Sequence, residues 1–249
     1  MKRPLSGIRK SDEYSINNIV NEVSTSTEGS IFKGKIDDYL FGKELGKGAY
    51  AIVKIATHKV LNKKFAIKIY EKFKLLDPVR KNSVKREIEI LKKVDHKSIV
   101  KLHEVIDTPK QVIIFIIKIL LVMDLVNGVS LLAHLKSKQN RRLEENDAKY
   151  IFRQVLEGIK YLHNKNIFHR DIKLENLIID EFNTVKIIDF GFATVSHKTK
   201  PLNFFCGTPS YMPPEIVQKK DYLGHTAEIW TCGILLYTIL CGSFPFRGK

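Results

Sequence analysis

The sequence contains few cysteines, which limits the compartment in which the protein is expected to work. Three cysteines occur among 249 residues, all towards the end of the chain: Cys206, Cys232 and Cys241. A small and odd number is unlike the paired frameworks of disulfide-rich secreted domains. We therefore expect a reducing environment and a cytoplasmic location, with the nucleus as an alternative.

Long hydrophobic runs are also missing from the chain. The longest, residues 112–122, is interrupted by Lys118 and is too short to cross a bilayer as a helix. Residues 1–11 are basic but lack the apolar stretch of a signal peptide. We expect no membrane span and no secretion signal, while a hydrophobic content of 44% allows an ordinary buried core.

Acidic residues are in deficit, with 27 Asp and Glu against 42 Lys and Arg, so the net charge is +15. Charge alone admits nucleic acid, acidic membranes, nucleotides and acidic proteins as partners. The basic residues are scattered, however, and neither aromatic–basic alternation nor zinc-ligand spacing accompanies them. A solvated lysine-rich surface is the favoured interpretation, and no specific nucleic-acid partner is expected.

The hydrophobic pattern divides the chain into a polar tail, a strand-rich half and a helix-rich half. Residues 1–38 are rich in Ser, Thr, Asn and charge and have little periodicity, which is typical of a flexible tail. Residues 40–70 read as strands; Ala66, Lys68 and Tyr70 share one face and Phe65, Ile67 and Ile69 the other. No repeat is visible.

Three helices are expected from apolar residues that recur every three or four positions. The first spans about residues 80–94 and carries Glu87 inside its apolar stripe. The second spans about 146–163, with a cap near Asn146 or Asp147. The third, residues 228–241, is apolar nearly all round and is expected to be buried.

Two features of the strand-rich half suggest phosphate binding, although neither is specific alone. Gly46 and Gly48 lie between strand-like segments, where backbone amides can approach a phosphate or where the glycines simply form a turn. Lys68 would by default be a solvated strand residue. Glu87, however, needs a partner, because an uncompensated buried carboxylate is costly. A Lys68–Glu87 ion pair would satisfy it and orient the ammonium.

The most specific signal is the segment Ile167-Phe168-His169-Arg170-Asp171-Ile172-Lys173-Leu174-Glu175-Asn176-Leu177, followed by Asp189-Phe190-Gly191. It resembles the catalytic loop and metal-binding segment of eukaryotic protein kinases. The glycines, Lys68 and Glu87 lie upstream in the family's order. The resemblance covers residues 39–249. The segment from Cys206 to Glu215 is most similar to the calcium/calmodulin-dependent and AMP-activated kinase group.

The resemblance implies an α+β, bilobal kinase fold, with a small, mainly antiparallel-sheet lobe carrying one key helix and a larger, mainly helical lobe. The corresponding division is a tail at 1–38, a small lobe with its hinge at 39–128, and a large lobe at 129–249. The family continues through several more helices, so the large lobe is expected to be incomplete. A monomer is expected.

The resemblance also implies roles in phosphate transfer from MgATP to a Ser or Thr of a protein substrate. Asp171 corresponds to the catalytic base and Lys173 to the cation that shields the γ-phosphate from it. Lys68, held by Glu87, corresponds to the ligand of the α- and β-phosphates. Asn176 and Asp189 offer the oxygen ligands that Mg²⁺ prefers.

The implied nucleotide site uses the glycine loop, several apolar side chains and the hinge. The loop residues are Gly46, Lys47, Gly48 and Ala49. Leu45, Val53 and Ala66 would lie on one side of the adenine and Ile178 on the other. Met123 would be the residue before the hinge, and the backbones of Asp124 and Val126 would bind the adenine.

Several positions depart from the family pattern. Ala51 replaces the third glycine of the loop, and Glu228 replaces an aspartate, which is expected to shift hydrogen bonds to the catalytic loop. Residues 112–120 read as an extension, which leaves the position of the hinge open. Phe204 stands at the usual phosphate acceptor, which leaves Thr194, Ser196 or Thr199 as acceptors for an upstream activating kinase.

Two alternatives to an active protein kinase remain open. The chain could be a catalytically weak or inactive kinase-like scaffold, an alternative that the departures favour and that the retained Lys68, Asp171, Asn176 and Asp189 disfavour. It could also phosphorylate a small molecule, which the segment from Thr208 to Glu215 disfavours. Transfer of phosphate to a generic protein substrate distinguishes the three.

Overall fold

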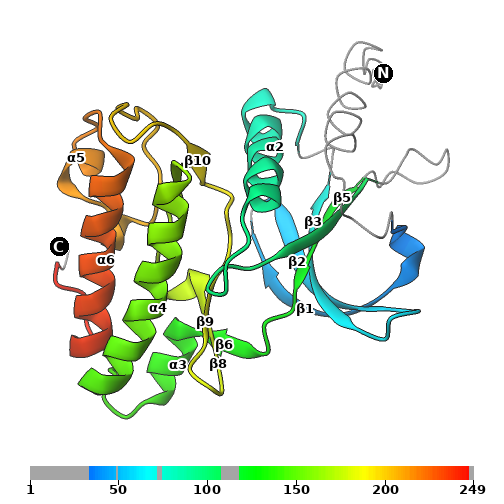
Figure 1. Cartoon of the computed structure of the whole chain (residues 1–249), viewed down its shortest axis with the longest axis horizontal. Helices are drawn as coiled ribbons and strands as arrows, with labels where there is room; N and C mark the ends of the chain where they lie inside the picture. The colour runs from blue at the N-terminus through cyan, green and yellow to red at the C-terminus, as the bar shows by residue number, and fades with distance from the viewer. Residues whose placement is uncertain (1–33, 49, 72–74, 108–117, 247–249) are drawn as a thin grey trace, which may run out of the picture.

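The computed structural model describes residues 34–48, 50–71, 75–107 and 118–246, which form two lobes (Figure 1). Most of the predicted tail and most of the predicted extension therefore lie outside the described residues. The smaller lobe is an antiparallel five-stranded sheet in the order β1-β2-β3-β5-β4 with helix α2 beside it. Its elements are β1 (Tyr39–Lys47), β2 (Ala51–His58), β3 (Lys64–Glu71), α2 (Pro78–Lys93), β4 (Leu102–Asp107) and β5 (Lys118–Asp124). A short 3-10 helix, Ile36–Asp38, precedes the sheet.

Strand β3 shows the alternation expected from its sequence. Phe65, Ile67 and Ile69 are buried in a hydrophobic cluster on the outer face of the sheet. Tyr70 belongs instead to the main core, which lies on the side of α2 and includes Val84 and Ile88. Lys68 shares the face of Tyr70, so β3 delivers its lysine towards α2.

Helix α2 confirms the first predicted helix and begins two residues earlier than expected. The side chain of Asp77 accepts a hydrogen bond from the Val79 amide, and Pro78 occupies the first turn, where its missing N–H costs nothing. Val84, Ile88 and Leu91 are buried. Glu87, in the same stripe, is only 2% exposed.

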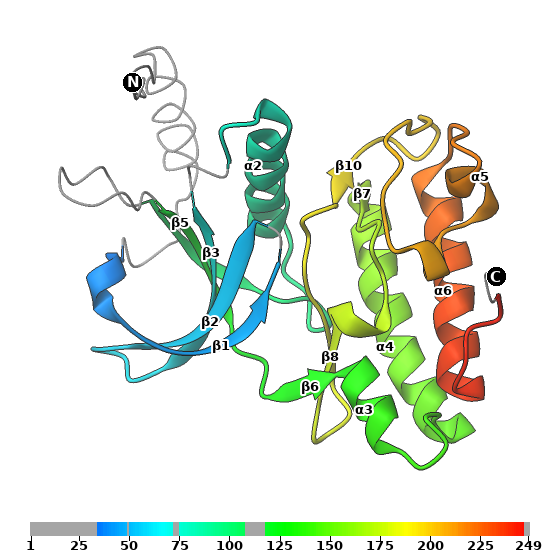
Figure 2. The same cartoon turned by 180° about the vertical axis from the view of Figure 1, so that it is seen from behind.

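The larger lobe is mainly helical, with α4 and α6 packed side by side (Figures 1 and 2). Its helices are α3 (Leu131–Ser137), α4 (Glu145–Asn164), α5 (Pro214–Val217) and α6 (Gly224–Cys241). Two small sheets accompany them: β6 (Gly128–Ser130), β8 (Leu177–Asp180) and β9 (Val185–Ile187) in one, and β7 (Ile167–Phe168) with β10 (Thr194–Val195) in the other.

The start of α4 corrects the predicted cap. The helix begins at Glu145 after the N-cap Glu144, whose side chain makes no capping hydrogen bond. Asn146 and Asp147 therefore lie in the first turn. An acidic side chain there stabilises the helix by interacting with the positive end of its dipole. The apolar face has the expected positions, with Ile151 and Val155 buried.

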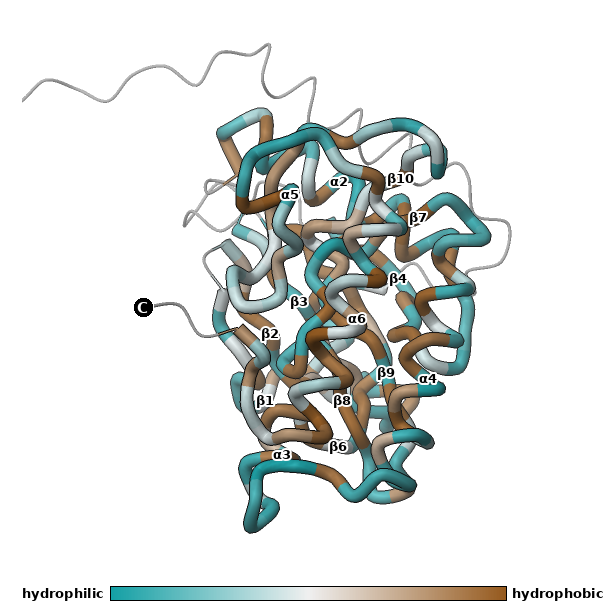
Figure 3. The backbone as a smooth tube through the Cα atoms, turned by 90° about the vertical axis from the view of Figure 1, so that its left-hand side faces the viewer, coloured by the Kyte–Doolittle hydropathy of each residue, from teal (hydrophilic) through white to brown (hydrophobic). Residues whose placement is uncertain are grey.

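Helix α6 begins at Gly224, four residues before the predicted start. A glycine normally indicates a loop, but a Cβ at Gly224 would lie 2.5 Å from the Phe168 ring, so close packing explains the residue. The prediction of burial all round is wrong for one face: Ile229 is 60% and Tyr237 44% exposed. Figure 3 shows the hydrophobic character of α6 in brown.

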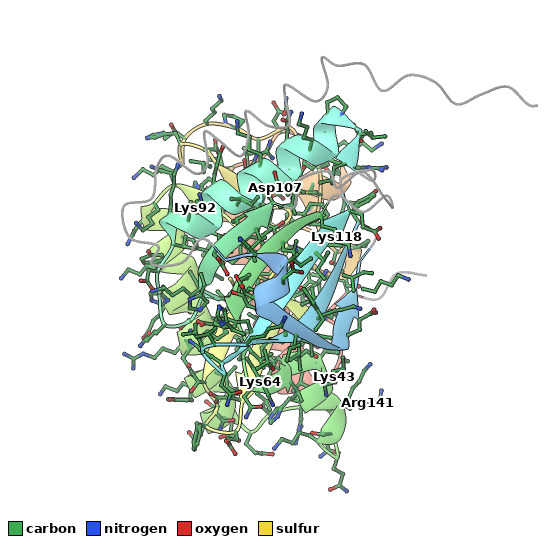
Figure 4. The ribbon with its side chains drawn as sticks, turned by 90° about the vertical axis from the view of Figure 1, so that its right-hand side faces the viewer. Lys43, Lys64, Lys92, Asp107, Lys118 and Arg141 are labelled. Carbon is green, nitrogen blue, oxygen red and sulfur yellow. The ribbon has the colours of Figure 1, made fainter. Side chains whose placement is uncertain are left out.

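The pairing of β5 fixes the position of the hinge. Met123 lies opposite Ala66 and Leu121 opposite Lys68, and Lys118–Leu120 belong to this strand rather than to an extension. Figure 4 looks onto the smaller lobe; its labelled lysines come from separate elements and are spread across the face. Among the described residues, no helix combines the length and apolarity needed to cross a membrane.

Candidate active site

Strand β3 and helix α2 bring together the lysine and glutamate that the sequence paired. The Lys68 ammonium lies 2.8 Å from Glu87 Oε1 and also 2.8 Å from Asp189 Oδ1. The Lys68 side chain is 12% exposed, and that of Asp189 is 48% exposed. One largely buried cation therefore joins the smaller lobe to the segment that follows β9.

Lys68 and Asp189 both remain charged at neutral pH. Burial by itself would lower the pKa of Lys68, but Glu87 and other neighbours raise this pKa well above its usual value. Burial would raise the pKa of Asp189, but Lys68 outweighs that effect and leaves this pKa below its usual value. An ammonium and a carboxylate are thus both present where an anionic ligand and a cation would meet.

The hairpin of β8 and β9 places Asn176 beside Asp189. Leu177 pairs with Ile187, and the Ile188 amide donates a hydrogen bond of 2.9 Å to the Asn176 carbonyl. The side chains of Asn176 and Asp189 are both oxygen donors. No cluster of three His, Cys, Asp or Glu side chains suited to a metal occurs among the residues described. This donor set fits Mg²⁺, which takes few protein ligands and is completed by phosphate and water.

Asp171 is 6% exposed and is held from three sides. Its Oδ2 lies 2.8 Å from Lys173 Nζ and 3.0 Å from Asn176 Nδ2. The Thr208 hydroxyl donates to Oδ1 at 2.9 Å and accepts from Lys173 at the same distance. The carboxylate therefore has one orientation, with a cation beside it and a hydroxyl in front of it.

The residues expected around an adenine are apolar but belong to neither hydrophobic cluster of their region. Leu45 is 47% exposed, and Val53, Ala66 and Ile178 are partly exposed. By contrast, Leu177 and Ile179, on either side of Ile178, are buried. This arrangement leaves an apolar surface available on both lobes, as an aromatic ligand requires.

The glycine loop joins β1 and β2 by a turn that the Gly48 amide closes with a 2.8 Å hydrogen bond to the Ala51 carbonyl. A Cβ added at Gly46 would meet no atom within 4 Å, so this glycine borders open space. Lys47 ends β1, and Ala49 lies outside the described residues. The loop therefore has room for a phosphate chain.

At the hinge, the Asp124 side chain has a protein partner, while the backbone N–H of Val126 has none in the part of the chain that the structure describes. Asp124 Oδ1 lies 2.6 Å from His103 Nε2 on β4, and this hydrogen bond keeps the pKa of Asp124 below its usual value. Met123 is buried, at 9% exposed. Within the described residues, the backbone N–H of Val126 has no acceptor and is available to a ligand.

Comparison with known families identifies this arrangement. The family described as "Protein kinase domain" matches residues 39–249, which is most of the chain. The chain belongs to the protein kinase family. The expected bilobal α+β fold is confirmed by this match together with the sheet and helices described above.

Several curated kinases are similar to this kinase domain. The SNF1-related protein kinase catalytic subunit alpha KIN12 of Arabidopsis thaliana is 37% identical over 85% of the chain and 41% of its own length. The serine/threonine-protein kinase SIK2 of Gallus gallus is 37% identical over 86% of the chain and 26% of its own length. The CBL-interacting serine/threonine-protein kinase 1 of Arabidopsis thaliana is 38% identical over 86% of the chain and 47% of its own length.

These relatives confirm the predicted resemblance to serine/threonine kinases of the calcium/calmodulin-dependent and AMP-activated group. The kinase chain spans less than half the length of each of the three. The roles of the individual site residues stay predictions, and the structure supplies their positions. It brings the predicted catalytic and metal-binding residues into one connected set of contacts.

Glu228 of α6 holds the catalytic loop of this kinase in spite of its extra methylene. Its Oε1 accepts a 2.7 Å hydrogen bond from the Arg170 amide, and its Oε2 lies 2.5 Å from His163 Nε2 on α4. Glu228 is 2% exposed, so it depends on these partners. The longer side chain therefore connects the catalytic loop to two helices.

The arginine that precedes the catalytic aspartate contacts an aromatic ring in this kinase. The Arg170 guanidinium lies 5.4 Å from the centre of the Phe204 ring, and its Nε donates to the Phe192 carbonyl at 2.8 Å. Among the described residues, no carboxylate pairs with this guanidinium. The Phe204 carbonyl in turn accepts from the Tyr222 hydroxyl at 2.9 Å. Phosphorylation of Thr194, Ser196 or Thr199 stays a prediction.

Removing the Phe204 ring is expected to slow the kinase modestly. An exposed cation–π contact contributes about 0.5–1 kcal/mol, so Phe204→Ala should lower the rate of transfer to a basic protein about threefold. Phe205→Ala is the control, because the Phe205 ring faces Tyr222, 6.4 Å away, rather than Arg170. Equal losses in the two variants would show that the contact with Arg170 is unimportant.

Sequence reasoning missed several partners that the fold brings to the site. The Thr208 contact with Asp171 joins positions 37 residues apart, and no local pattern reveals it. The His163 contact with Glu228 depends on how α4 packs on α6. Tyr70 was visible on the face of Lys68, but its contact with Glu87 required the position of α2.

Proposed function

We propose that this chain is a protein serine/threonine kinase, which transfers the γ-phosphate of MgATP to a hydroxyl of a protein substrate. The observation that carries the proposal is a continuous set of contacts. Asp171 contacts Asn176, Asn176 is backbone-bonded to the residue before Asp189, and Asp189 contacts Lys68, which is paired with Glu87. Phosphate transfer requires a base, a metal site and a phosphate-binding cation at one place.

The chemistry assigns one task to each group. The substrate hydroxyl oxygen forms a bond to the γ-phosphorus, the bond from that phosphorus to the β–γ bridging oxygen breaks, and the hydroxyl proton passes to Asp171. Lys68 binds the α- and β-phosphates, and Lys173 neutralises charge near the transferred group. Asn176 and Asp189 would hold Mg²⁺, which would supply charge neutralisation on the phosphate oxygens.

The proposed preference for Ser and Thr rests on the surroundings of Asp171. Lys173 and Thr208 contact the carboxylate and each other, so they form a small, closed environment in front of the base. A short aliphatic hydroxyl can approach such a base more readily than a large phenol. The names of the three relatives described above agree with this proposal, since two of them state serine/threonine specificity.

Two measurements test the proposed function. MgATP should raise the melting temperature of the protein, because a ligand that binds only the folded state stabilises it by mass action. Radiolabelled phosphate from ATP should appear on Ser or Thr of a generic basic protein. Binding without transfer would favour the scaffold alternative. Transfer only to a small hydroxylated molecule would favour the alternative of a small-molecule kinase. Absence of both binding and transfer would overturn the proposed site.

A further inference from the structure

A tyrosine next to the phosphate-binding lysine makes a contact that the family resemblance does not assign. The Tyr70 hydroxyl donates a hydrogen bond to Glu87 Oε2, while Lys68 occupies the other carboxylate oxygen at 2.8 Å. Lys68 and Tyr70 are two residues apart on β3, so they project from the same face of the strand. Each oxygen of Glu87 therefore has its own donor, and both donors come from one strand.

The hydrogen bond between Tyr70 and Glu87 is buried, so its loss would be costly. Tyr70 is 5% and Glu87 2% exposed, so water is not at hand to replace a lost donor. In the described residues, Glu87 makes no other side-chain hydrogen bond than those to Lys68 and Tyr70. Without the phenol hydroxyl, one oxygen of a buried carboxylate would be unsatisfied, and Glu87 could turn away from Lys68.

Tyr70 also approaches the lysine itself. The Lys68 ammonium lies 5.4 Å from the centre of the Tyr70 ring, a distance suited to a cation–π contact. Burial and the Glu87 carboxylate raise the pKa of Tyr70, so its hydroxyl remains a donor. The ring thus supports the cation while the hydroxyl fixes its counter-ion.

The surroundings of Gly191 show how closely this group is packed. A Cβ added there would lie 3.3 Å from Asp189 Oδ1, 3.9 Å from Glu87 Oε2 and 4.0 Å from Lys68 Nζ. A shift of the Glu87 carboxylate would therefore change the packing around Gly191, in the segment that carries Asp189. The position of the carboxylate matters for both the phosphate-binding cation and the metal ligand.

We propose that Tyr70 is a positioning residue for phosphate transfer: it fixes the Glu87 carboxylate through the oxygen that Lys68 does not occupy and so holds α2 and the lysine in the arrangement that binds ATP phosphates. The inference rests on the proposed kinase function. Tyr70 does not touch the reacting atoms and acts through Glu87.

A double-mutant cycle tests this role. Tyr70→Phe removes only the hydroxyl and should lower kcat/KM for ATP about tenfold, which corresponds to about 1.4 kcal/mol. Glu87→Gln alone should lower kcat/KM by more than Tyr70→Phe does. If Tyr70 acts through Glu87, adding Tyr70→Phe to Glu87→Gln should change kcat/KM less than twofold, because contacting residues are non-additive. Multiplication of the two separate losses would overturn the proposal.

The chain offers a matched control on the other face of the same sheet. The Tyr39 hydroxyl donates to Glu104, and Tyr39 is 6% exposed, so Tyr39→Phe removes a partly buried tyrosine–glutamate hydrogen bond away from the site. It should lower the melting temperature and leave kcat/KM unchanged. Equal kinetic losses in the two variants would show that Tyr70 acts only through stability.

The affinity for MgATP separates failure of this inference from failure of the proposed function. If the unaltered protein transfers no phosphate, the kinase function fails, and the cycle is measured on the dissociation constant for MgATP, where Tyr70→Phe should weaken binding severalfold. If it transfers phosphate and Tyr70→Phe behaves like Tyr39→Phe in rate and affinity, only the role of Tyr70 fails.

Discussion

Replacement of Asp171 by asparagine should reduce phosphate transfer about a thousandfold, since removal of a positioned general base costs about 10²–10⁴ in rate. The amide cannot accept the hydroxyl proton. It retains the shape of the carboxylate, so the fold around Asn176 and Thr208 should persist. MgATP affinity should change little, because the proposed nucleotide contacts are made by Lys68, Asp189 and the hinge.

The measurement pairs single-turnover rates with the dissociation constant for MgATP. Asp147→Asn, on the exposed first turn of α4, makes the same chemical change away from the site and should leave both quantities unaltered. Near-normal turnover in the Asp171 variant would contradict its assignment as the base. Loss of MgATP binding together with turnover would instead indicate that the substitution disrupts the site.

Truncation of Glu228 is expected to damage both stability and transfer. Glu228→Ala leaves the partly buried Arg170 amide without its acceptor and His163 without its partner. Breaking a buried polar network of this kind costs about 3 kcal/mol, which should lower the melting temperature by about 10 °C for a domain of this size. Transfer should fall at least about tenfold, because the loop backbone next to Asp171 loses its anchor.

A shorter carboxylate distinguishes the two contacts of Glu228. Glu228→Asp should retain one partner and lose the other, so its melting temperature should lie between those of the unaltered protein and Glu228→Ala. Glu181→Ala, on an exposed turn, should change the unfolding free energy by less than about 0.5 kcal/mol. If Glu228→Ala unfolds at the same temperature as the Glu181 variant, the buried network contributes nothing measurable.

The parts of the fold that follow local periodicity could be predicted from the sequence. The alternation in β3 places Lys68 on the face that meets α2, and the apolar stripe of α2 shows that Glu87 is buried there. Those two patterns together predict the ion pair, which the structure contains. The division of the chain into a tail and two lobes at residues 38 and 128 stays a prediction.

The rest depended on tertiary packing. The sequence pattern places the start of α6 too late because Gly224 reads as a loop residue, while its packing against Phe168 suits a helix. The sequence does not fix the hinge because the start of β5 lies within a continuous apolar segment, and only strand pairing places Met123 opposite Ala66. The partners Thr208, Tyr70 and His163 come from distant segments, so no local pattern reveals them.

The hydrogen bond between His103 and Asp124 has an evolutionary consequence. The Asp124 side chain is bonded to His103 of β4, so the proposed recognition of adenine at the hinge relies on main-chain groups, which do not depend on the identity of the side chain. Nucleotide recognition should therefore place no constraint on the side chain at position 124. The constraint on that side chain should come instead from its hydrogen bond to residue 103. Across homologous sequences, these two positions should covary, while neither should covary with residues of the glycine loop.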